Sequence, residues 1–238
     1  MTAASVSATL GAVEIEDAIY AVDARAVGSA HYDRMGALYD AVCGTMAYNR
    51  VVWGTTPDRS RAFATRIFES QNAGVHVEVG CGGLLFTAHL YDEARDRVCI
   101  LSDPSIAMLR MARERLRRRQ GEVPSHVALL LADGFSLPFP DGFATTVLSM
   151  HVLHVLERRD EFLRGLDRLG APTSATIGFS SLVRTGHFRD GFLVALHAAG
   201  ELSSPLADDE LAELARSAFD GEIDVEARGS LRFCTVTR

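Results

Sequence analysis

The chain has 238 residues, of which 47% are hydrophobic, and its formal net charge at pH 7 is −7. This length and apolar content suit one sizeable core and exclude a disordered chain. The negative charge argues against nucleic acid as the main partner, because phosphate binding needs a positive surface. No apolar run has the length of a membrane span and the N-terminus has no export-signal pattern, so we expect a cytoplasmic protein without membrane contact.

The cysteines and the basic residues give further information on the kind of protein. The four cysteines, Cys43, Cys81, Cys99 and Cys234, show no CxxC spacing or Cys/His cluster, which indicates reduced thiols and no metal site. All 24 basic residues are arginine, and together with the alanine content this is typical of a GC-rich bacterial genome. The basic run at 113–120 is interpreted as a solvated helix face.

Residues 1–73 do not alternate between strand and helix patterns. Helical patterns are predicted at 31–42, 48–54 and 60–70. We therefore expect an N-terminal helical lid segment over residues 1–73, which covers the open end of a sheet formed by the rest of the chain.

From residue 74 onward, short apolar runs alternate with helical patterns. Strands are predicted at 75–79, 97–101, 126–132, 144–150 and 174–180, and helices at 84–94, 104–119, 158–169 and 208–219. This alternation predicts an α/β domain over residues 74–238 with a mostly parallel sheet. Two further strands, at 222–228 and 231–238, are separated only by Gly229 and Ser230, so they form a hairpin that introduces one antiparallel strand.

The stretch VHVEVGCGGLLFT, residues 75–87, places three glycines at the end of the first predicted strand. Ligands bind beyond the carboxyl ends of parallel strands, and glycines there allow a close backbone approach. We expect the following helix to direct its N-terminal N–H groups at a carboxylate or phosphate. Position 85, where a dinucleotide fingerprint needs its third glycine, is Leu85, and no phosphate-loop lysine follows. An ordinary strand-to-helix turn is the alternative.

Two acids end the next two predicted strands. Asp103 is placed to accept both hydroxyls of a ribose, although Asp103 followed by Pro104 is also a good helix start. Asp133 is placed to accept from an adenine amino group, and its alternative is a loop-capping aspartate.

The combination of EVGCGG, DPSIAML, ADGFSLPFPDGF and VLSMHVLHVL resembles the class I S-adenosylmethionine-dependent methyltransferases, in particular the small-molecule group related to quinone-biosynthesis enzymes. The resemblance implies a Rossmann-like sheet of seven strands, mostly parallel with one antiparallel strand, and S-adenosylmethionine as cofactor. It also implies a cofactor site formed by Tyr39, Glu78, Gly80, Cys81, Gly82, Asp103, Pro104, Met108, Asp133, Gly134, Phe135 and Ser149.

Two positions depart from the pattern of this family. Leu84 stands where the last glycine of the loop is usual, and Ala144 stands where an aspartate usually opens the fourth strand. Neither departure removes the predicted ribose acid.

Methyl transfer depends on positioning, and a base is needed only when the acceptor must lose a proton. His151 and His154 are the candidate bases after the fourth strand, and their alternatives are a pocket wall or a buried hydrogen-bonded histidine. The absence of an Asn/Asp-Pro-Pro-Tyr/Phe motif favours a small-molecule acceptor, in secondary metabolism. A homodimer is compatible with this prediction. An enzyme of another reaction type, such as a cyclase, and a non-catalytic cofactor-binding partner subunit are the alternatives.

Overall fold

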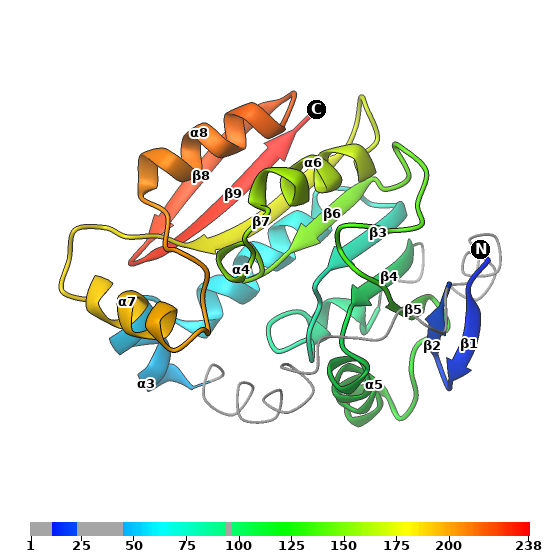
Figure 1. Cartoon of the computed structure of the whole chain (residues 1–238). Helices are drawn as coiled ribbons and strands as arrows, with labels where there is room; N and C mark the ends of the chain where they lie inside the picture. The colour runs from blue at the N-terminus through cyan, green and yellow to red at the C-terminus, as the bar shows by residue number, and fades with distance from the viewer. Residues whose placement is uncertain (1–10, 23–44, 94–96) are drawn as a thin grey trace.

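A computed structural model of the chain describes residues 11–22, 45–93 and 97–238 (Figure 1). The helix predicted at 31–42, with Tyr39, lies outside them. The strands of the described residues are β1 (Val13–Glu16), β2 (Ile19–Ala21), β3 (Gly74–Val79), β4 (Arg97–Asp103), β5 (Val127–Leu131), β6 (Thr146–Ser149), β7 (Thr176–Leu182), β8 (Glu222–Arg228) and β9 (Leu231–Thr237).

All nine strands belong to one sheet, in the order β1-β2-β5-β4-β3-β6-β7-β9-β8. The seven predicted strands are β3 to β9, and β3 to β7 run parallel to one another. The last strand, β9, is antiparallel to both β7 and β8, as the two-residue link before it requires. The predicted fold class, a Rossmann-like mostly parallel sheet with a reversed final strand, is therefore confirmed.

The described residues form nine strands rather than seven, because residues 13–21, where the sequence predicts no strand, form a hairpin. In this hairpin β1 is antiparallel to β2, and β2 extends the sheet by pairing in parallel with β5. The turn contains Ala18 with φ 59° in place of a glycine. Strands this short, joined by a turn without Gly or Asn, carry almost no pattern for prediction.

The hairpin supplies acidic partners to the helix that contains the basic run at 113–120. Arg110 and Arg113 of the helix α5 (Ile106–Gln120) pair with Glu16, and Arg117 of the same helix pairs with Asp17. Arginines on one helix face thus bind the acidic hairpin, which attaches the added edge of the sheet to α5.

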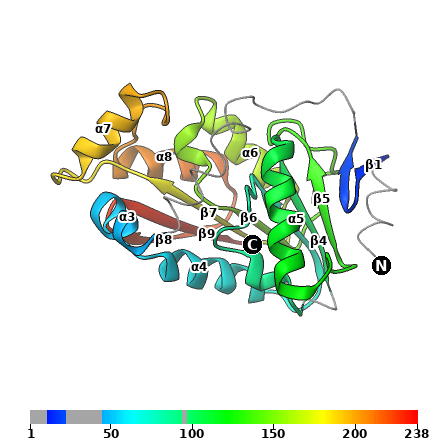
Figure 2. The same ribbon diagram turned by 90° about the horizontal axis from the view of Figure 1, so that it is seen from below.

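The helices are distributed over both faces of the sheet (Figure 2). Their bounds are α3 (Met46–Tyr48), the π-helix η1 (Asn49–Trp53), α4 (Pro57–Glu69), the 3₁₀-helix η2 (Ala88–Tyr91), α5 (Ile106–Gln120), the 3₁₀-helix η3 (Leu153–Val155), α6 (Arg159–Leu169), α7 (Asp190–Ala198) and α8 (Asp208–Ala218). One core lies under α4, η2 and α5, and the other under α6 and α8. No helix in the described parts of the chain is long and apolar enough to cross a bilayer.

The period-two alternation of β3 assigns its side chains to these two cores. Val77 and Val79 pack with the α6 and α8 layer. His76 and Glu78 point to the opposite face, where both lie within hydrogen-bonding distance of the Tyr91 hydroxyl. The central strand therefore has an apolar face and a polar buried face.

The helix predicted at 84–94 is wrong for most of its length. Only Ala88–Tyr91 is helical, as a single 3₁₀ turn. Leu84 has φ 59°, which is outside the right-handed helical region and prevents a helix from starting there. A turn of this length has no N-terminal anion site, so the expected helix N-terminus after the glycine loop is absent from the described residues.

We predict that Gly178→Ala destabilises the protein. A Cβ at Gly178 of β7 would lie 2.4 Å from Cγ1 of Ile67 and 3.1 Å from the Phe63 ring, because α4 packs directly on the strand. Overpacking of this kind typically lowers the free energy of unfolding by about 1–3 kcal/mol. Chemical denaturation measures the change in the free energy of unfolding.

The matched control is Gly191→Ala in α7, where a Cβ meets nothing within 4 Å and helix propensity predicts equal or greater stability. Equal stability of the two variants would contradict the packing argument.

Candidate functional site

A cavity of about 170 Å³ lies at the carboxyl ends of β3, β4 and β6. Its lining comes from the glycine loop, from the start of α5 and from the segment after β6. The lining residues are Glu78, Gly80, Cys81, Gly82, Gly83, Leu85, Phe86, Thr87, Asp103, Pro104, Met108, Met150, His151, Val152, Val155 and Leu156. Seven of the predicted cofactor residues, namely Glu78, Gly80, Cys81, Gly82, Asp103, Pro104 and Met108, are thus brought together.

The glycine loop has a backbone that side chains would disturb. Gly80 has φ 71°, and a Cβ there would lie 2.5 Å from Val152. Gly82 has φ 53° with open space where its Cβ would stand. The N–H groups of Gly80 and Cys81 both donate to the Ser102 carbonyl, at 2.8 and 2.9 Å. The loop therefore exposes bare backbone to the cavity and is fixed to the neighbouring strand.

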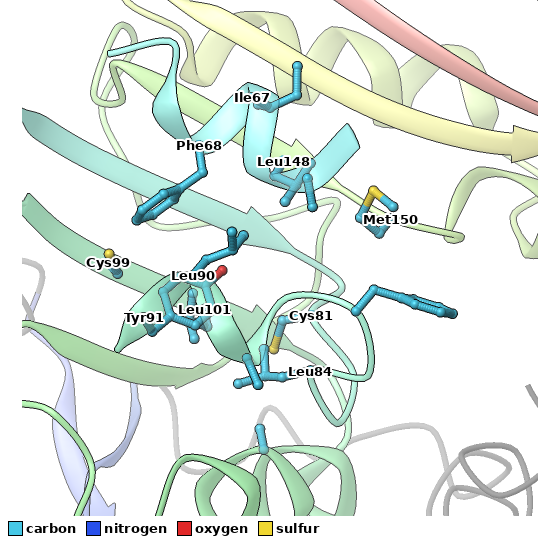
Figure 3. Close-up of a cluster of buried hydrophobic side chains, with 14 of the residues drawn as sticks. Ile67, Phe68, Cys81, Leu84, Leu90, Tyr91, Cys99, Leu101, Leu148 and Met150 are labelled. Carbon is cyan, nitrogen blue, oxygen red and sulfur yellow. The ribbon is translucent and has the colours of Figure 1, made fainter. Parts of the chain in front are cut away.

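Leu84 adopts the left-handed conformation that a glycine would favour. Its side chain is fully buried and joins the apolar cluster of Cys81, Leu101 and Tyr91 (Figure 3). Arg115 of α5 donates to the carbonyl of the preceding Gly83. Leu84 thus has a backbone conformation that a glycine adopts readily, and its side chain belongs to the core.

The Asp103 carboxylate is held at the end of β4 by two backbone donors. Oδ2 accepts from Gly82 N and Oδ1 from Ser105 N, each at 2.9 Å. The alternative role of Asp103 as a helix cap belongs to Ser105, whose side chain accepts from Met108 N at 3.2 Å. A carboxylate has about four acceptor positions, so these two bonds are compatible with further hydrogen bonds from the hydroxyl groups of a ligand.

Glu78 is a fully buried carboxyl group on the floor of the cavity. Thr87 Oγ1 lies 3.1 Å from Oε1, and the Tyr91 hydroxyl lies 2.5 Å from Oε2. Burial raises the pKa of Glu78 to about 8, and the two hydroxyl donors oppose the shift.

His151 is the one histidine that the structure places on the cavity among the described residues. Its backbone has φ 59°, and its N–H donates to Ser180 Oγ at 2.9 Å. The imidazole stacks on Trp53 with centroids 5.2 Å apart, and Nε2 lies 3.2 Å from Ser60 Oγ. Nδ1 is buried and has no partner among the described residues. Burial lowers the pKa of His151 to about 4, so the ring is neutral at pH 7.

His154, the second predicted base, serves the backbone instead. Nδ1 accepts from Leu182 N at 3.3 Å, and the residue does not line the cavity. Burial lowers its pKa to about 3, with further contributions from His151 and Arg159. This is the alternative role of a buried hydrogen-bonded histidine.

Four other predicted cofactor residues do not line the cavity. Asp133 is exposed and accepts from Phe135 N at 3.0 Å, which is the loop-capping alternative. Gly134 packs beside Phe162 and Phe135 lies under Arg158, while Ser149 is buried with its hydroxyl unpartnered among the described residues.

Sequence reasoning missed the apolar part of the cavity wall. Phe86, Val152, Val155 and Leu156 line it, but such residues look like ordinary core in a sequence. Ser60 was missed because it reaches His151 from 91 positions away. Cys81, Cys99 and Cys234 are free thiols, and the described residues contain no group of three metal-ligating side chains.

We predict that Leu84→Gly is more stable than Leu84→Ala. Both variants lose a buried leucine, which costs about 2–5 kcal/mol. Both variants must adopt the left-handed backbone of Leu84. Glycine does so without steric cost, whereas alanine loses about 1 kcal/mol of stability. Thermal or urea unfolding of the two variants tests this order, which is the reverse of the order found in regular helices and strands. A more stable alanine variant would show that the positive φ is no constraint.

The sequence and the fold were compared with protein families, curated proteins and solved structures. The family model of the methyltransferase domain matches residues 77–177, which span β3 to the start of β7 and contain most of the cavity lining. A comparison with curated proteins finds no match.

Solved structures share the fold at low sequence identity. A methyltransferase from Thermotoga maritima, described as a possible histamine N-methyltransferase, has 15% identity and a TM-score of 0.63, with 87% of this chain and 97% of that chain covered. Phosphoethanolamine N-methyltransferase 2 from Haemonchus contortus, in complex with S-adenosylhomocysteine, has 13% identity and a TM-score of 0.66, covering 87% and 57%. The 4+2 cyclase SpnF has 18% identity and a TM-score of 0.63, covering 87% and 93%. Residues 77–177 therefore resemble the methyltransferase domain, and the chain has the fold of the class I, S-adenosylmethionine-dependent methyltransferases.

Proposed function

We propose that the protein is an S-adenosylmethionine-dependent methyltransferase that acts on a small, largely apolar molecule, in secondary metabolism. The observation that carries the proposal is one cavity that joins a bare glycine loop, the anchored Asp103 carboxylate and an apolar wall with a single neutral histidine.

The polar end of the cavity fits the cofactor. Gly82 leaves open space where a side chain would stand, so ligand atoms can approach the backbone. Asp103 offers two oriented oxygens to the ribose hydroxyls, and Met108 gives an apolar surface to the adenine. When bound, S-adenosylmethionine supplies an activated methyl carbon on its sulfonium group. The residues of this chain hold and orient the reactants, which contributes through proximity.

The other end of the cavity supports the proposed class of acceptor. Phe86, Met150, Val155 and Leu156 form an apolar wall, and Trp53 supports His151 from behind. The lining on this side carries no charged group. An uncharged acceptor with apolar or aromatic surface fits such a wall, whereas a phosphorylated acceptor would lose hydration without finding a counter-charge.

His151 is proposed as the base for an acceptor hydroxyl or carbon acid. Its Nδ1 has no protein partner among the described residues, and Ser60 and Trp53 fix the ring. A neutral imidazole can accept a proton, and the low pKa keeps it neutral well below pH 6. The sequence alone predicts a fall in activity near the ordinary histidine pKa; burial moves the expected fall toward pH 4.

A cyclase that keeps the cofactor pocket is the second candidate, because the fold is shared with SpnF. Transfer of a labelled methyl group to an acceptor distinguishes the two functions. A non-catalytic partner subunit would bind cofactor and show neither methyl transfer nor cyclisation.

We predict that Asp103→Asn weakens binding of S-adenosylhomocysteine by about 1–3 kcal/mol, or roughly 5- to 150-fold, since a charged acceptor is lost. Isothermal titration calorimetry measures the dissociation constant. Asp141→Asn is the matched control, because Asp141 is an exposed aspartate paired with Arg168 away from the cavity. Equal affinity of wild type and Asp103→Asn would contradict the proposal that Asp103 binds the ribose hydroxyls.

We predict that His151→Asn lowers methyl-transfer turnover by about 10²–10⁴-fold while cofactor affinity changes only a few-fold. Wild-type turnover should stay level as the pH falls from 8 to 5.5, and should decrease only as His151 is protonated near pH 4. A panel of hydroxylated apolar acceptors with labelled cofactor supplies the assay. His89→Asn is the control, because His89 contacts Thr65 outside the cavity. Near-normal turnover of His151→Asn would show that His151 is not a general base and only lines the pocket.

A further inference from the structure

The turn between β8 and β9 is bonded to two distant parts of the chain. Ser230 N donates to the Trp53 carbonyl at 2.8 Å, and the Ser230 carbonyl accepts from Val183 N at 2.8 Å. Val183 directly follows β7, and Trp53 ends η1. The turn therefore ties the segment of α3 and η1 to the end of β7, and Figure 2 shows this segment beside the β8–β9 end of the sheet.

Gly229 makes the contact between this turn and η1 a close one. Its backbone has φ 59°, and a Cβ there would lie 2.3 Å from the Trp53 carbonyl oxygen and 2.6 Å from the Gly54 carbonyl oxygen. Both oxygens belong to the backbone, so no change of rotamer could make room for a side chain at this position. Glycine permits this approach, and any other residue must displace the loop at Trp53 and Gly54.

The Trp53 side chain is not fixed by a hydrogen bond of its own. Its Nε1 is buried and has no hydrogen-bond partner among the described residues, and only 2% of the residue is exposed. The indole contacts the Tyr48 ring edge to face, with centroids 5.4 Å apart. The position of the indole therefore depends on ring packing and on where the Trp53 backbone is held.

The position of the His151 ring depends in turn on the indole. The two rings are stacked, with centroids 5.2 Å apart and an interplanar angle of 21°. The His151 N–H is bonded to Ser180 of β7, the strand to whose end the turn is attached. A shift of the turn must therefore change the position of the indole relative to the imidazole, because the His151 backbone is fixed to the sheet.

We propose that Gly229 is a positioning residue for His151: the absence of a side chain at this turn lets Trp53 lie against the imidazole on the cavity wall. For its effect on methyl transfer the inference rests on the proposed function, in which His151 is the base. Gly229 and Ser230 do not line the cavity and lie apart in the sequence from the glycine loop and Asp103. A change at the turn should therefore affect the acceptor side and leave cofactor binding unchanged.

Two spectroscopic signals report on this contact without an acceptor. Trp53 is the only tryptophan of the chain, so tryptophan fluorescence reports on this residue alone. The imidazole Cε1–H resonance of His151 lies in the ring current of the indole, which shifts it away from the resonances of exposed histidines such as His187 and His197. His151→Asn identifies the resonance among those of the eight histidines.

Gly229→Ala should change both signals at pH 7. The His151 resonance should lose most of its ring-current shift, and the Trp53 emission should move to longer wavelength as water reaches the indole. Gly200→Ala is the matched control, because Gly200 also has a positive φ, 78°, but a Cβ there meets nothing within 4 Å. The control has the same backbone strain without the contact, so both of its signals should equal those of wild type.

Gly229→Asn is a second variant that separates the contact from backbone strain. Asparagine tolerates a left-handed backbone but still carries a Cβ, so this variant should show the same two changes. A His151 resonance of wild type at the position of the exposed histidines overturns the proposal even if neither variant at Gly229 folds.

Turnover and binding separate the acceptor side from the cofactor side. Methyl transfer from labelled cofactor to hydroxylated apolar acceptors should fall by about 10²-fold in Gly229→Ala, which is the loss that a misplacement of about 1 Å can cause. The affinity for S-adenosylhomocysteine, measured by calorimetry, should equal that of wild type.

The outcomes distinguish the two proposals. Unchanged His151 and Trp53 signals in Gly229→Ala, or wild-type turnover in this variant while His151→Asn is inactive, overturn the positioning role and leave His151 as the proposed base. Changed signals together with wild-type turnover in both Gly229→Ala and His151→Asn overturn the proposed base instead.

Discussion

The hydrogen bond between the Asp103 carboxylate and the Gly82 amide is the constraint on which the site depends. It joins the loop after β3 to the end of β4, and a second bond from Ser105 fixes the same carboxylate to the start of α5. Three chain segments thereby meet at one group. Because the amide donors lie on bare backbone with positive φ at Gly80 and Gly82, the junction stays open on the side of the cavity.

The two ends of the cavity differ in their electrostatic environment. At the glycine loop, burial raises the pKa of Glu78, and the nearby Asp103 carboxylate adds to the shift. At the opposite wall, His151 sits among Trp53 and Phe86 without an acidic partner, and burial keeps it neutral. The glycine-loop end of the cavity suits S-adenosylmethionine, and the apolar wall supports the proposed uncharged acceptor.

Backbone strain marks the same region. Leu84 and His151 are two of three non-glycine residues with positive φ in the described parts of the chain, and they follow β3 and β6, two of the three strands at whose ends the cavity lies. Such conformations persist when surrounding contacts hold them. Leu84 is held by its buried side chain, and His151 by Ser180, Ser60 and the stack on Trp53. The departure of Leu84 from the family pattern thus leaves the turn itself in place.

The sequence by itself determined the parallel sheet, the reversed last strand and the acids at strand ends, because these follow from local periodicity, from a two-residue link and from the rule that strand ends meet at one edge. It also identified Gly80, Gly82 and Asp103 as neighbours. Only the tertiary structure shows that His151 lines the cavity while His154 bonds to Leu182 N, since both follow the same strand and differ in what packs around them. It likewise decided that Asp133 caps its own loop, that residues 13–21 extend the sheet, and that Glu78 faces Tyr91 and His76. These outcomes depend on burial and on contacts between distant residues, which a local pattern does not contain.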